Sequence, residues 1–287
     1  MTTIMKAKEA AERIYDHVRS RAQALKESGT QPQLAVILVE GDPASAYYAQ
    51  AKRKIADRLG VAYRLHELPA SATEASLLQL IAECNADPAI HGILLELPLP
   101  ARLSARRIER AIAPAKDVDG VTPANKLAVV TGEAGLYPAT PQACIALVKH
   151  YGYALEGADV TLVGRGQTVG LPLFHLLQRE QATVTVCHSR TPDIAAHLSR
   201  AAFAFVAVGR PDTVTPGMVH PGLVLVDAGI NELADGSIAG DVAAGAGDRA
   251  AAYSPVPGGV GTLTTAIVFR NLMDAIDWQQ QKEAIGE

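Results

Sequence analysis

The chain has 287 residues, of which 48% are hydrophobic and 20% are charged. It is long enough to bury one large core or two modest ones, and this composition excludes global disorder. A formal net charge of −4, without a run of lysines or arginines, gives no basic footprint for nucleic acid. We therefore expect a small-molecule partner.

The three cysteines and the apolar runs indicate the cellular compartment. Cys84, Cys144 and Cys187 are widely spaced and form no C-x-x-C pair, which predicts reduced, buried thiols and neither a disulfide framework nor a zinc site. The first residues lack the apolar stretch of a signal peptide, and no run approaches the ~18 apolar residues that a membrane span needs. We expect a cytoplasmic protein without a metal.

The first half of the chain alternates predicted strands and helices. Continuous apolar runs predict buried strands, and apolar residues at helical spacing predict helices between them. Asp42 and Gly60 have the residue types of a helix N-cap and a helix stop. The predicted helices cover 7–27, 43–59 and 74–85, and the predicted strands cover 34–39, 63–68 and 93–97. This alternation predicts βαβ units and a parallel sheet.

A region rich in Pro, Gly, Asp and Thr, from Pro114 to Pro141, is interpreted as a link to a second α/β series. That series has predicted strands over 158–163, 183–187, 204–208 and 223–227, and a closing helix over 263–278. The expected fold is α/β, with an N-terminal substrate domain and a Rossmann-type domain, and with the final helix returning to the first domain. The predicted boundaries are 1–141 plus 264–287 for the first domain and 142–263 for the second.

The second domain carries a candidate dinucleotide site. Its first strand runs into Gly164-Arg165-Gly166-Gln167-Thr168-Val169-Gly170, and a helix follows. Glycines let the backbone approach a pyrophosphate at a helix N-terminus, although this spacing is one residue longer than the usual fingerprint. The motif alone is also compatible with an ordinary strand-to-helix turn. The strand–turn–helix context favours a nucleotide.

The residues after the next strand favour NADP over NAD. An NAD site places a carboxylate there for the ribose 2′-OH, whereas this chain has His188, Ser189 and Arg190. Arg165 is a second cation near the same place, and two guanidiniums suit a 2′-phosphate. Each arginine taken singly is more often a solvated surface residue, so the prediction depends on their shared location.

The first domain carries candidate acid–base groups. Tyr48 and Lys52 are four residues apart on one helix face near the carboxyl end of a strand, where α/β sheets bind ligands. A lysine in a partly dry cleft can serve in acid–base catalysis, although a surface lysine beside a half-buried tyrosine is the commoner meaning. Asp119, in Lys116-Asp117-Val118-Asp119-Gly120, could accept hydrogen bonds from a guanidine-like heterocycle, and the same residues would also suit a plain turn. Glu96 ends a predicted strand, and the sequence does not decide whether it is exposed or buried.

Together these segments resemble the bifunctional methylenetetrahydrofolate dehydrogenase/methenyltetrahydrofolate cyclohydrolase family. The resemblance covers most of the chain and rests on the following segments: Gly41-Asp-Pro-Ala-Ser45 with Tyr48 and Lys52, Gly92–Pro100, Lys116–Gly120, Thr140-Pro141, Gly164–Pro172, Thr185–Ser189, Asp227–Asn231, Gly240–Val242 and Pro255–Gly261.

The resemblance implies two reactions, NADP-dependent oxidation of 5,10-methylenetetrahydrofolate and hydrolysis of the methenyl product to 10-formyltetrahydrofolate. It implies that Lys52 is the main catalytic group, with Tyr48, Glu96 and Asp119 beside it. The implied folate-binding residues are Tyr48, Leu97, Pro98, Leu99, Asp119 and Gly259. The implied cofactor-binding residues are Gly164, Arg165, Gly166, Thr168, Val169, Gly170, His188, Ser189, Arg190, Val208, Gly209 and Ile230. A homodimer is also implied.

Several residues depart from the family pattern. Glu96 stands where the family usually has Gln, and a carboxylate close to Lys52 favours the charged amine, which impairs a lysine that must act as a base. We therefore predict a weakened cyclohydrolase and a better preserved dehydrogenase. Gly166 replaces a common Ser, Ala139 replaces Cys, and Thr262-Leu263 replaces Pro-Met, which leaves open a modified pterin or a narrower reaction scope.

Two other interpretations remain open at this point. One is an NADP-dependent dehydrogenase acting on another small substrate, such as a shikimate-type enzyme, which also pairs a lysine with an aspartate. The other is a catalytically silent paralogue that binds folate or nucleotide. Retention of Lys52 and Asp119 opposes the second interpretation, while Glu96 keeps it open.

Overall fold

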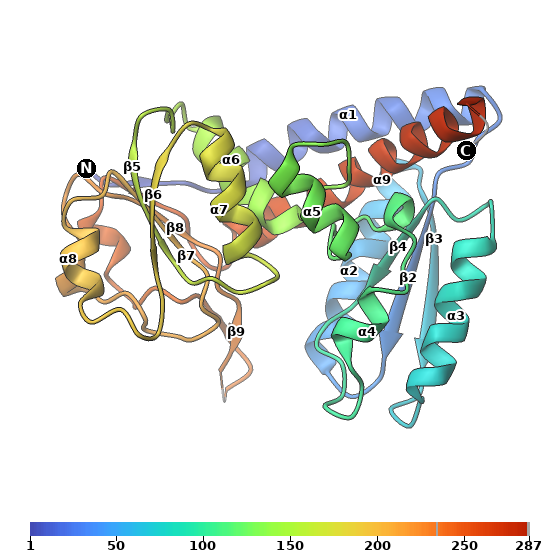
Figure 1. Ribbon diagram of the computed structural model, residues 1–287, viewed down its shortest axis with the longest axis horizontal. Coiled ribbons are helices and arrows are strands. Elements are labelled where there is room, and N and C mark those ends of the chain that lie inside the picture. The colour runs from blue at the N-terminus through green and yellow to red at the C-terminus, as the bar shows by residue number, and fades with distance from the viewer. Residues whose placement is uncertain (234, 286–287) are drawn as a thin grey trace. The chain divides into compact units, whose positions relative to one another are not determined.

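The computed structural model describes residues 1–233 and 235–285 and divides into two compact α/β units (Figure 1). Unit 1 comprises Met1–Arg13 and Pro138–Ile267, and unit 2 comprises Ile14–Tyr137 and Val268–Glu287, of which residues 286–287 lie outside the described part. Helices α1 (Lys8–Glu27) and α9 (Val260–Ile285) contribute residues to both units. The predicted α/β class with two domains is confirmed.

The N-terminal residues belong to a different unit from the one that the sequence suggested. The predicted first domain began at residue 1, whereas residues 1–13 group with unit 1. The reason is a backbone pairing that no periodicity signals: the two-residue strand β1 (Thr3–Ile4) pairs in parallel with β11 (Ala252–Tyr253).

Unit 2 is built on a three-stranded parallel sheet in the order β3–β2–β4. Its strands are β2 (Gln33–Val39), β3 (Ala62–Leu68) and β4 (Gly92–Leu95), and its helices include α2 (Pro43–Leu59), α3 (Glu74–Ala86), α4 (Ala105–Glu109) and α5 (Pro123–Thr131). β2 is central and buried on both faces, as its continuous apolar sequence predicts. The predicted alternation of strands and helices in this half of the chain is confirmed.

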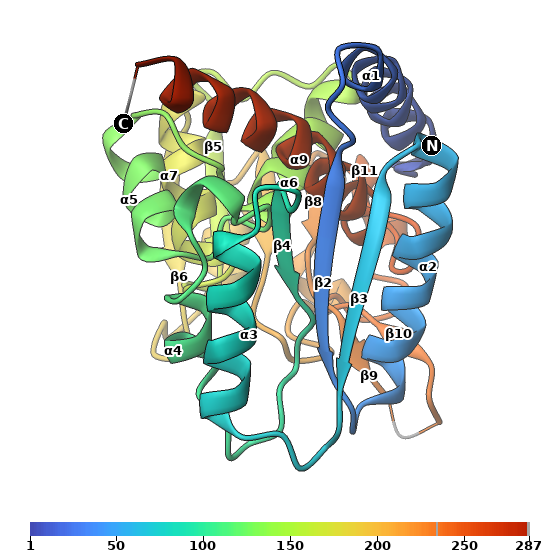
Figure 2. The same ribbon diagram turned by 90° about the vertical axis from the view of Figure 1, so that its right-hand side faces the viewer.

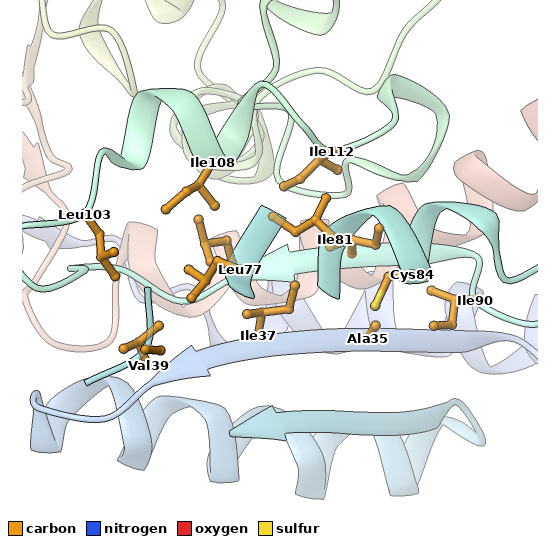
Figure 3. Packing of buried hydrophobic residues seen from close by; sticks show 13 residues of the cluster. Ala35, Ile37, Val39, Leu77, Ile81, Cys84, Ile90, Leu103, Ile108 and Ile112 are labelled. Carbon is orange, nitrogen blue, oxygen red and sulfur yellow. The ribbon is translucent and has the colours of Figure 1, made fainter. Parts of the chain in front are cut away.

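One apolar cluster fills the space between the sheet of unit 2 and α3. Ala35, Ile37 and Val39 alternate along β2, so they all face the same side, where Leu77 and Ile81 of α3 meet them (Figure 3). Helix α2 lies on the other side of the sheet. The sheet is thus held between two helix layers, and its carboxyl edge can carry functional side chains.

The final helix packs into unit 2, as predicted. Asn271 Nδ2 donates to the carbonyls of Val118 and Tyr137, and Gln279 Nε2 donates to the carbonyls of His91 and Ala115. In Figure 2 this part of α9 passes over the amino end of β4, which begins just after His91. Side-chain amides on α9 therefore donate to backbone carbonyls outside the strands of the sheet and hold these segments against the helix.

The interpretation of 114–141 as a link is wrong. The segment contains the 3₁₀ helix η1 (Pro114–Lys116) and helix α5, and α6 (Ala139–His150) begins before it ends. The Thr122 side chain accepts from the amide of Asn125 at the start of α5, and Gly132 ends it with a φ of 81°. The prolines and glycines that suggested a link instead mark helix ends.

Unit 1 has a six-stranded parallel sheet in the order β1–β11–β8–β7–β5–β6, as expected for a Rossmann-type domain. Its longer strands are β5 (Asp159–Val163), β6 (Thr183–Cys187), β7 (Phe203–Val206) and β8 (Val224–Asp227), and its further elements are α7 (Gly170–Arg179), α8 (Ile194–Leu198), η2 (Pro216–Met218), η3 (Gly247–Arg249) and the antiparallel pair β9 (Asn231–Glu232) and β10 (Ile238–Ala239).

The three cysteines are buried and unpaired, as predicted. Burial raises the pKa of the Cys144 thiol, which keeps the thiol protonated. Over residues 1–233 and 235–285, the helices include none with the length and apolar character needed to cross a bilayer.

Candidate active site and dinucleotide site

Lys52 and Glu96 come from neighbouring elements at the carboxyl edge of the sheet in unit 2. The Asp42 side chain accepts from the amide of Ser45 and fixes the start of α2, which places Lys52 in the third turn of that helix. Glu96 directly follows β4, and its amide donates to the carbonyl of Ile37 at 2.9 Å. The strand pairing therefore continues to Glu96 and fixes the backbone from which its side chain projects.

These two side chains form a buried ion pair. Lys52 Nζ lies 2.7 Å from Glu96 Oε1 and 2.8 Å from Oε2, and the side chains are 14% and 8% exposed. Both oxygens of the carboxylate thus accept from the same ammonium, which is a strong, charge-assisted arrangement. The structure answers the question that the sequence left open: Glu96 is buried and engages the candidate catalytic lysine.

Tyr48 lies one turn before Lys52 on the same face of α2. Its ring centroid is 6.0 Å from Lys52 Nζ, and 38% of the residue is exposed. Ser45, also on α2, donates through Oγ to the carbonyl of Leu97 at 3.0 Å and so fixes the loop after β4. An aromatic ring, an ammonium and this loop therefore share one edge of unit 2.

Two residues of the segment 116–120 are structural. Lys116 is 8% exposed, and its Nζ donates to the carbonyls of Cys84, Asn85 and Asp87 at the end of α3. Asp117 is fully buried and accepts from the amides of Val121 and Thr122 and from Asn125 Nδ2. Their hydrogen-bonding groups are already used, so they position the turn that carries Asp119.

Asp119 has the electrostatics of a functional carboxyl. Burial raises its pKa to about 7, the negative charge of Asp117 acts in the same direction, and Lys52 opposes both. The side chain lines a small pocket with Leu97 and Glu109. Among the residues that the structure describes, none donates a hydrogen bond to the carboxyl of Asp119. Its acceptor capacity is available to a ligand.

Glu109 is a pocket residue that the sequence analysis missed. Burial raises the pKa of its carboxyl, Lys126 lowers it and Asp117 raises it. Glu109 ends a five-residue helix whose other charged residues are arginines, and this contrast is the only signal that the sequence offered. With Asp117 and Asp119, it gives the pocket three acidic residues among apolar walls.

The remaining predicted folate residues lie in different settings. Leu97 and Pro98 are exposed at the carboxyl edge of the sheet, and Leu97 lines the pocket. Leu99 instead packs against the apolar cluster under α3, so its side chain is partly committed to the core. Gly259 belongs to unit 1, where a Cβ would come 2.4 Å from the carbonyl oxygen of Pro255. Backbone packing alone therefore requires glycine at that position.

The turn between β5 and α7 has the backbone of a phosphate-binding loop. Gly164 has a φ of +116°, and a Cβ there would lie 2.1 Å from the carbonyl oxygen of Ala207. At Gly170 a Cβ would lie 2.5 Å from the carbonyl oxygen of Gly164. Gly166 has open space around it, and residues 165–168, which include Thr168, are exposed before Val169 and the first turn of α7. The outer glycines close the turn, and its exposed backbone leads to a helix N-terminus that favours anions.

The loop after β6 presents Ser189 and Arg190 to solvent, with His188 partly buried beneath them. The amide of Arg190 donates to His188 Nδ1 at 3.2 Å, which shapes the loop. The first carboxylate after this strand, Asp193, accepts from the amide of Ala196 and caps α8. The loop therefore presents an exposed hydroxyl and an exposed guanidinium at the place where an NAD site would have a carboxylate.

The other predicted dinucleotide residues follow β7 and β8. Val208 and Ile230 are 42% and 57% exposed, and Gly209 has a φ of +70°. Beneath these loops lie two buried carboxylates, Asp227 and Asp241, whose role the sequence alone did not indicate. Exposed apolar side chains beside a glycine-rich turn suit the rings of a dinucleotide, so the residues present fit this group.

Comparisons with known proteins cover both halves of the chain. Residues 5–119 match the catalytic domain of tetrahydrofolate dehydrogenase/cyclohydrolase, and residues 138–280 match the NAD(P)-binding domain of the same family. The bifunctional protein FolD of Heliobacterium modesticaldum is 50% identical over 273 residues, which are 95% of each chain.

Two solved structures are also similar. The bifunctional FolD enzyme of Campylobacter jejuni has a TM-score of 0.92 at 35% identity and covers 97% of this chain and 100% of its own. The Trypanosoma brucei methylenetetrahydrofolate dehydrogenase-cyclohydrolase, solved with NADP and an inhibitor, has a TM-score of 0.91 at 30% identity over 97% and 98% of the two chains. The chain belongs to the tetrahydrofolate dehydrogenase/cyclohydrolase family.

Proposed function

We propose that this protein oxidises 5,10-methylenetetrahydrofolate to the methenyl compound with NADP, and hydrolyses that product slowly to 10-formyltetrahydrofolate. Family membership supports the two reactions. The second reaction is proposed to be the slower one because of one observation, the ion pair in which both oxygens of Glu96 accept from Lys52. A match over both domains disfavours a dehydrogenase of an unrelated substrate.

On the folate side, unit 2 supplies binding groups for the pterin. The ionised carboxylate of Asp119 would accept hydrogen bonds from the N–H donors of the pterin edge. The exposed ring of Tyr48 would stack on the folate, and Leu97 with Pro98 would form an apolar border. These groups orient the methylene carbon, and orientation is the main requirement of a hydride transfer.

On the cofactor side, the turn 164–170 would hold the pyrophosphate, while Arg165 and Arg190 would bind the 2′-phosphate. Val208, Gly209 and Ile230 would line the remainder of the dinucleotide. When bound, NADP accepts the hydride with its electron pair from the methylene bridge. The relative from Trypanosoma brucei, solved with NADP, supports this choice of cofactor.

In the second reaction a water molecule adds to the methenyl carbon and gives up one proton to a base. The hydroxyl proton that remains passes to the nitrogen whose bond to that carbon opens. Lys52 would accept the first proton, which requires the neutral amine. In this chain both carboxylate oxygens of Glu96 accept from Lys52 Nζ, at 2.7 and 2.8 Å, which is a strong, charge-assisted contact. Proton transfer through Lys52 must disrupt this contact, so the hydrolysis is slow relative to the oxidation.

A spectrophotometric assay with methylenetetrahydrofolate and NADP tests the proposal, because NADPH and the methenyl product absorb separately. We expect NADPH to form and the methenyl compound to accumulate before it is hydrolysed. Reduction of NADP without accumulation would refute the slow second step. No reduction of NADP by a protein that binds both ligands would refute the dehydrogenase itself.

We also propose that the protein is a cytoplasmic homodimer. Three buried, unpaired cysteines suit a reducing compartment, and the resemblance to the family supports the dimer. Light scattering after size-exclusion chromatography would give the mass directly, and a monomer of 30.1 kDa at micromolar concentration would refute the dimer.

A further inference from the structure

Two buried carboxylates in unit 1 lie beneath the loops that are proposed to line the dinucleotide. Asp227 ends β8, and Asp241 follows β10; they are 4% and 0% exposed. A buried carboxylate is unfavourable unless donors compensate its charge. The hydrogen-bond donors that contact each carboxylate therefore indicate the role of the pair.

Asp241 gathers the amides of one loop. Its Oδ2 accepts from the amides of Val208 and Gly209, and its Oδ1 accepts from the amide of Arg210 at 2.8 Å and from Asn231 Nδ2 at 2.9 Å. Three consecutive backbone amides after β7 thus converge on a single carboxylate. The same side chain also ties that loop to Asn231, next to Ile230 in the loop after β8.

Asp227 holds Asp241 in place. Asp227 Oδ1 accepts from the amides of Gly229 and Asp241, and Oδ2 accepts from the amide of Val242. Its own amide donates to Ser254 Oγ at 2.8 Å. The end of β8 and the segment that carries Asp241 are therefore joined by charge-assisted hydrogen bonds.

Two glycines make this arrangement possible. A Cβ at Gly229 would lie 2.3 Å from the carboxyl carbon of Asp241, and a Cβ at Gly240 would lie 1.9 Å from Asp227 Oδ2. Each carboxylate thus occupies the space that a side chain would need on the other segment. This reciprocal packing explains the residue types in Asp227-x-Gly229 and Gly240-Asp241.

We propose that Asp241, anchored by Asp227, is a positioning residue that sets dinucleotide affinity by holding Val208, Gly209 and Ile230 in their binding geometry. Asp241 is buried beneath these residues and acts through their backbone. The inference rests on the proposed binding of NADP by this unit. Because unit 2 carries the proposed folate-binding groups, loss of the Asp241 carboxylate should weaken the affinity for NADP and leave the affinity for folate unchanged.

The test uses the full chain with Asp241→Asn, which keeps the side-chain shape but turns an N–H group toward amide donors. We expect the Kd for NADP, measured by titration calorimetry, to rise about tenfold or more, because charge-assisted contacts to three amides are weakened. The Kd for tetrahydrofolate should remain within about twofold, because Asp241 belongs to unit 1 and the proposed folate groups belong to unit 2. In the free protein, the amides of Val208, Gly209 and Arg210 should exchange with deuterium faster than in the wild type.

Asp248→Asn is the matched control, because Asp248 is exposed in the same unit, and we expect wild-type values from it. If Asp241→Asn does not fold, Asn231→Ala decides the question, because it removes only one donor to Asp241 and the contacts of Asn231 with Ala239 and Gly240. Unchanged NADP affinity in the folded variant, or unchanged exchange at 208–210, would overturn the inference. A wild-type protein that binds no NADP would instead refute the proposed cofactor, and the inference with it.

Discussion

Replacing Glu96 by Gln should accelerate the cyclohydrolase step while leaving the dehydrogenase step nearly unchanged. In the wild type, both oxygens of a carboxylate accept from the Lys52 ammonium, at 2.7 and 2.8 Å. Glutamine keeps the side-chain shape but offers one neutral acceptor oxygen. The charge-assisted contact with the carboxylate is lost, so the Lys52 side chain is released more readily for proton transfer.

The size of the effect follows from the hydrogen bonds that change. Glutamine keeps one of the two contacts that Glu96 makes with Lys52 Nζ, and a hydrogen bond to a charged group contributes about 1.5–3 kcal/mol, so the amide holds the ammonium less firmly by about that amount. A factor of ten corresponds to 1.36 kcal/mol, so the cyclohydrolase rate should rise about 10- to 150-fold. The substitution leaves a buried ammonium with weaker compensation and should lower the free energy of unfolding by about 1–3 kcal/mol.

The assay follows hydrolysis of methenyltetrahydrofolate by the wild type and by Glu96→Gln, with NADP reduction measured in parallel. The matched control is Glu74→Gln, which breaks an ion pair of unit 2 whose partner, Arg107, is largely exposed. We expect wild-type kinetics from the control and a stability loss below about 1 kcal/mol. A cyclohydrolase rate that is unchanged or lower in Glu96→Gln would refute the restraint by Glu96.

Three further predictions concern other residues of the two units. Because burial raises the pKa of Asp119 from 3.8 to about 7, its charge destabilises the folded state above pH 7 and not below pH 4. Asp119→Asn should therefore stabilise the protein at pH 8 by about 1–2 kcal/mol, after allowance for partial exposure of the carboxyl. Thermal unfolding should show this gain at pH 8 and none at pH 4. Folate binding at pH 8 should be weaker in the variant. Lys116→Met leaves three carbonyls without their donor, so calorimetry should show a loss of about 2–4 kcal/mol, and an unchanged melting temperature would contradict the structural role. Gly164→Ala should abolish NADP binding or folding through its backbone clash, whereas Gly217→Ala, with open space in the same unit and outside the turn, should bind NADP like the wild type; equal affinities would contradict the geometry.

The sequence predicted the regular elements of both sheets because their patterns are local. A continuous apolar run marks β2, and its burial on both faces follows from that run. Asp42 and Gly60 were recognised as helix ends from residue type alone, and both act as caps. In contrast, β1 and β11 have two residues each and exist through pairing between distant segments, which leaves no periodicity in the sequence.

The candidate site was predictable in residue type but not in role. The sequence pointed to both aspartates of the segment 116–120, and only the contacts show that Asp117 is saturated while Asp119 is not. Leu99 was grouped with Leu97 because they are close in the chain, but Leu99 packs against the core. Glu109 reaches the pocket through the folding of a short helix, and a single acidic residue among arginines is too weak a signal to predict that position.

The buried and partly buried carboxyls of this protein differ in the hydrogen-bond donors that contact them. Asp117 and Asp241 are filled by backbone amides and a side-chain amide, so they can shape a loop but cannot take a ligand. Asp119 lines its pocket without a donor from the described residues, and burial together with the negative charge of Asp117 raises its pKa. A heterocycle with N–H groups would donate hydrogen bonds to the carboxyl of Asp119, and its binding would lower the pKa of Asp119 again. Glu96 is the intermediate case, because its donor is the lysine that the second reaction needs, so the same contact that stabilises the site also limits its chemistry.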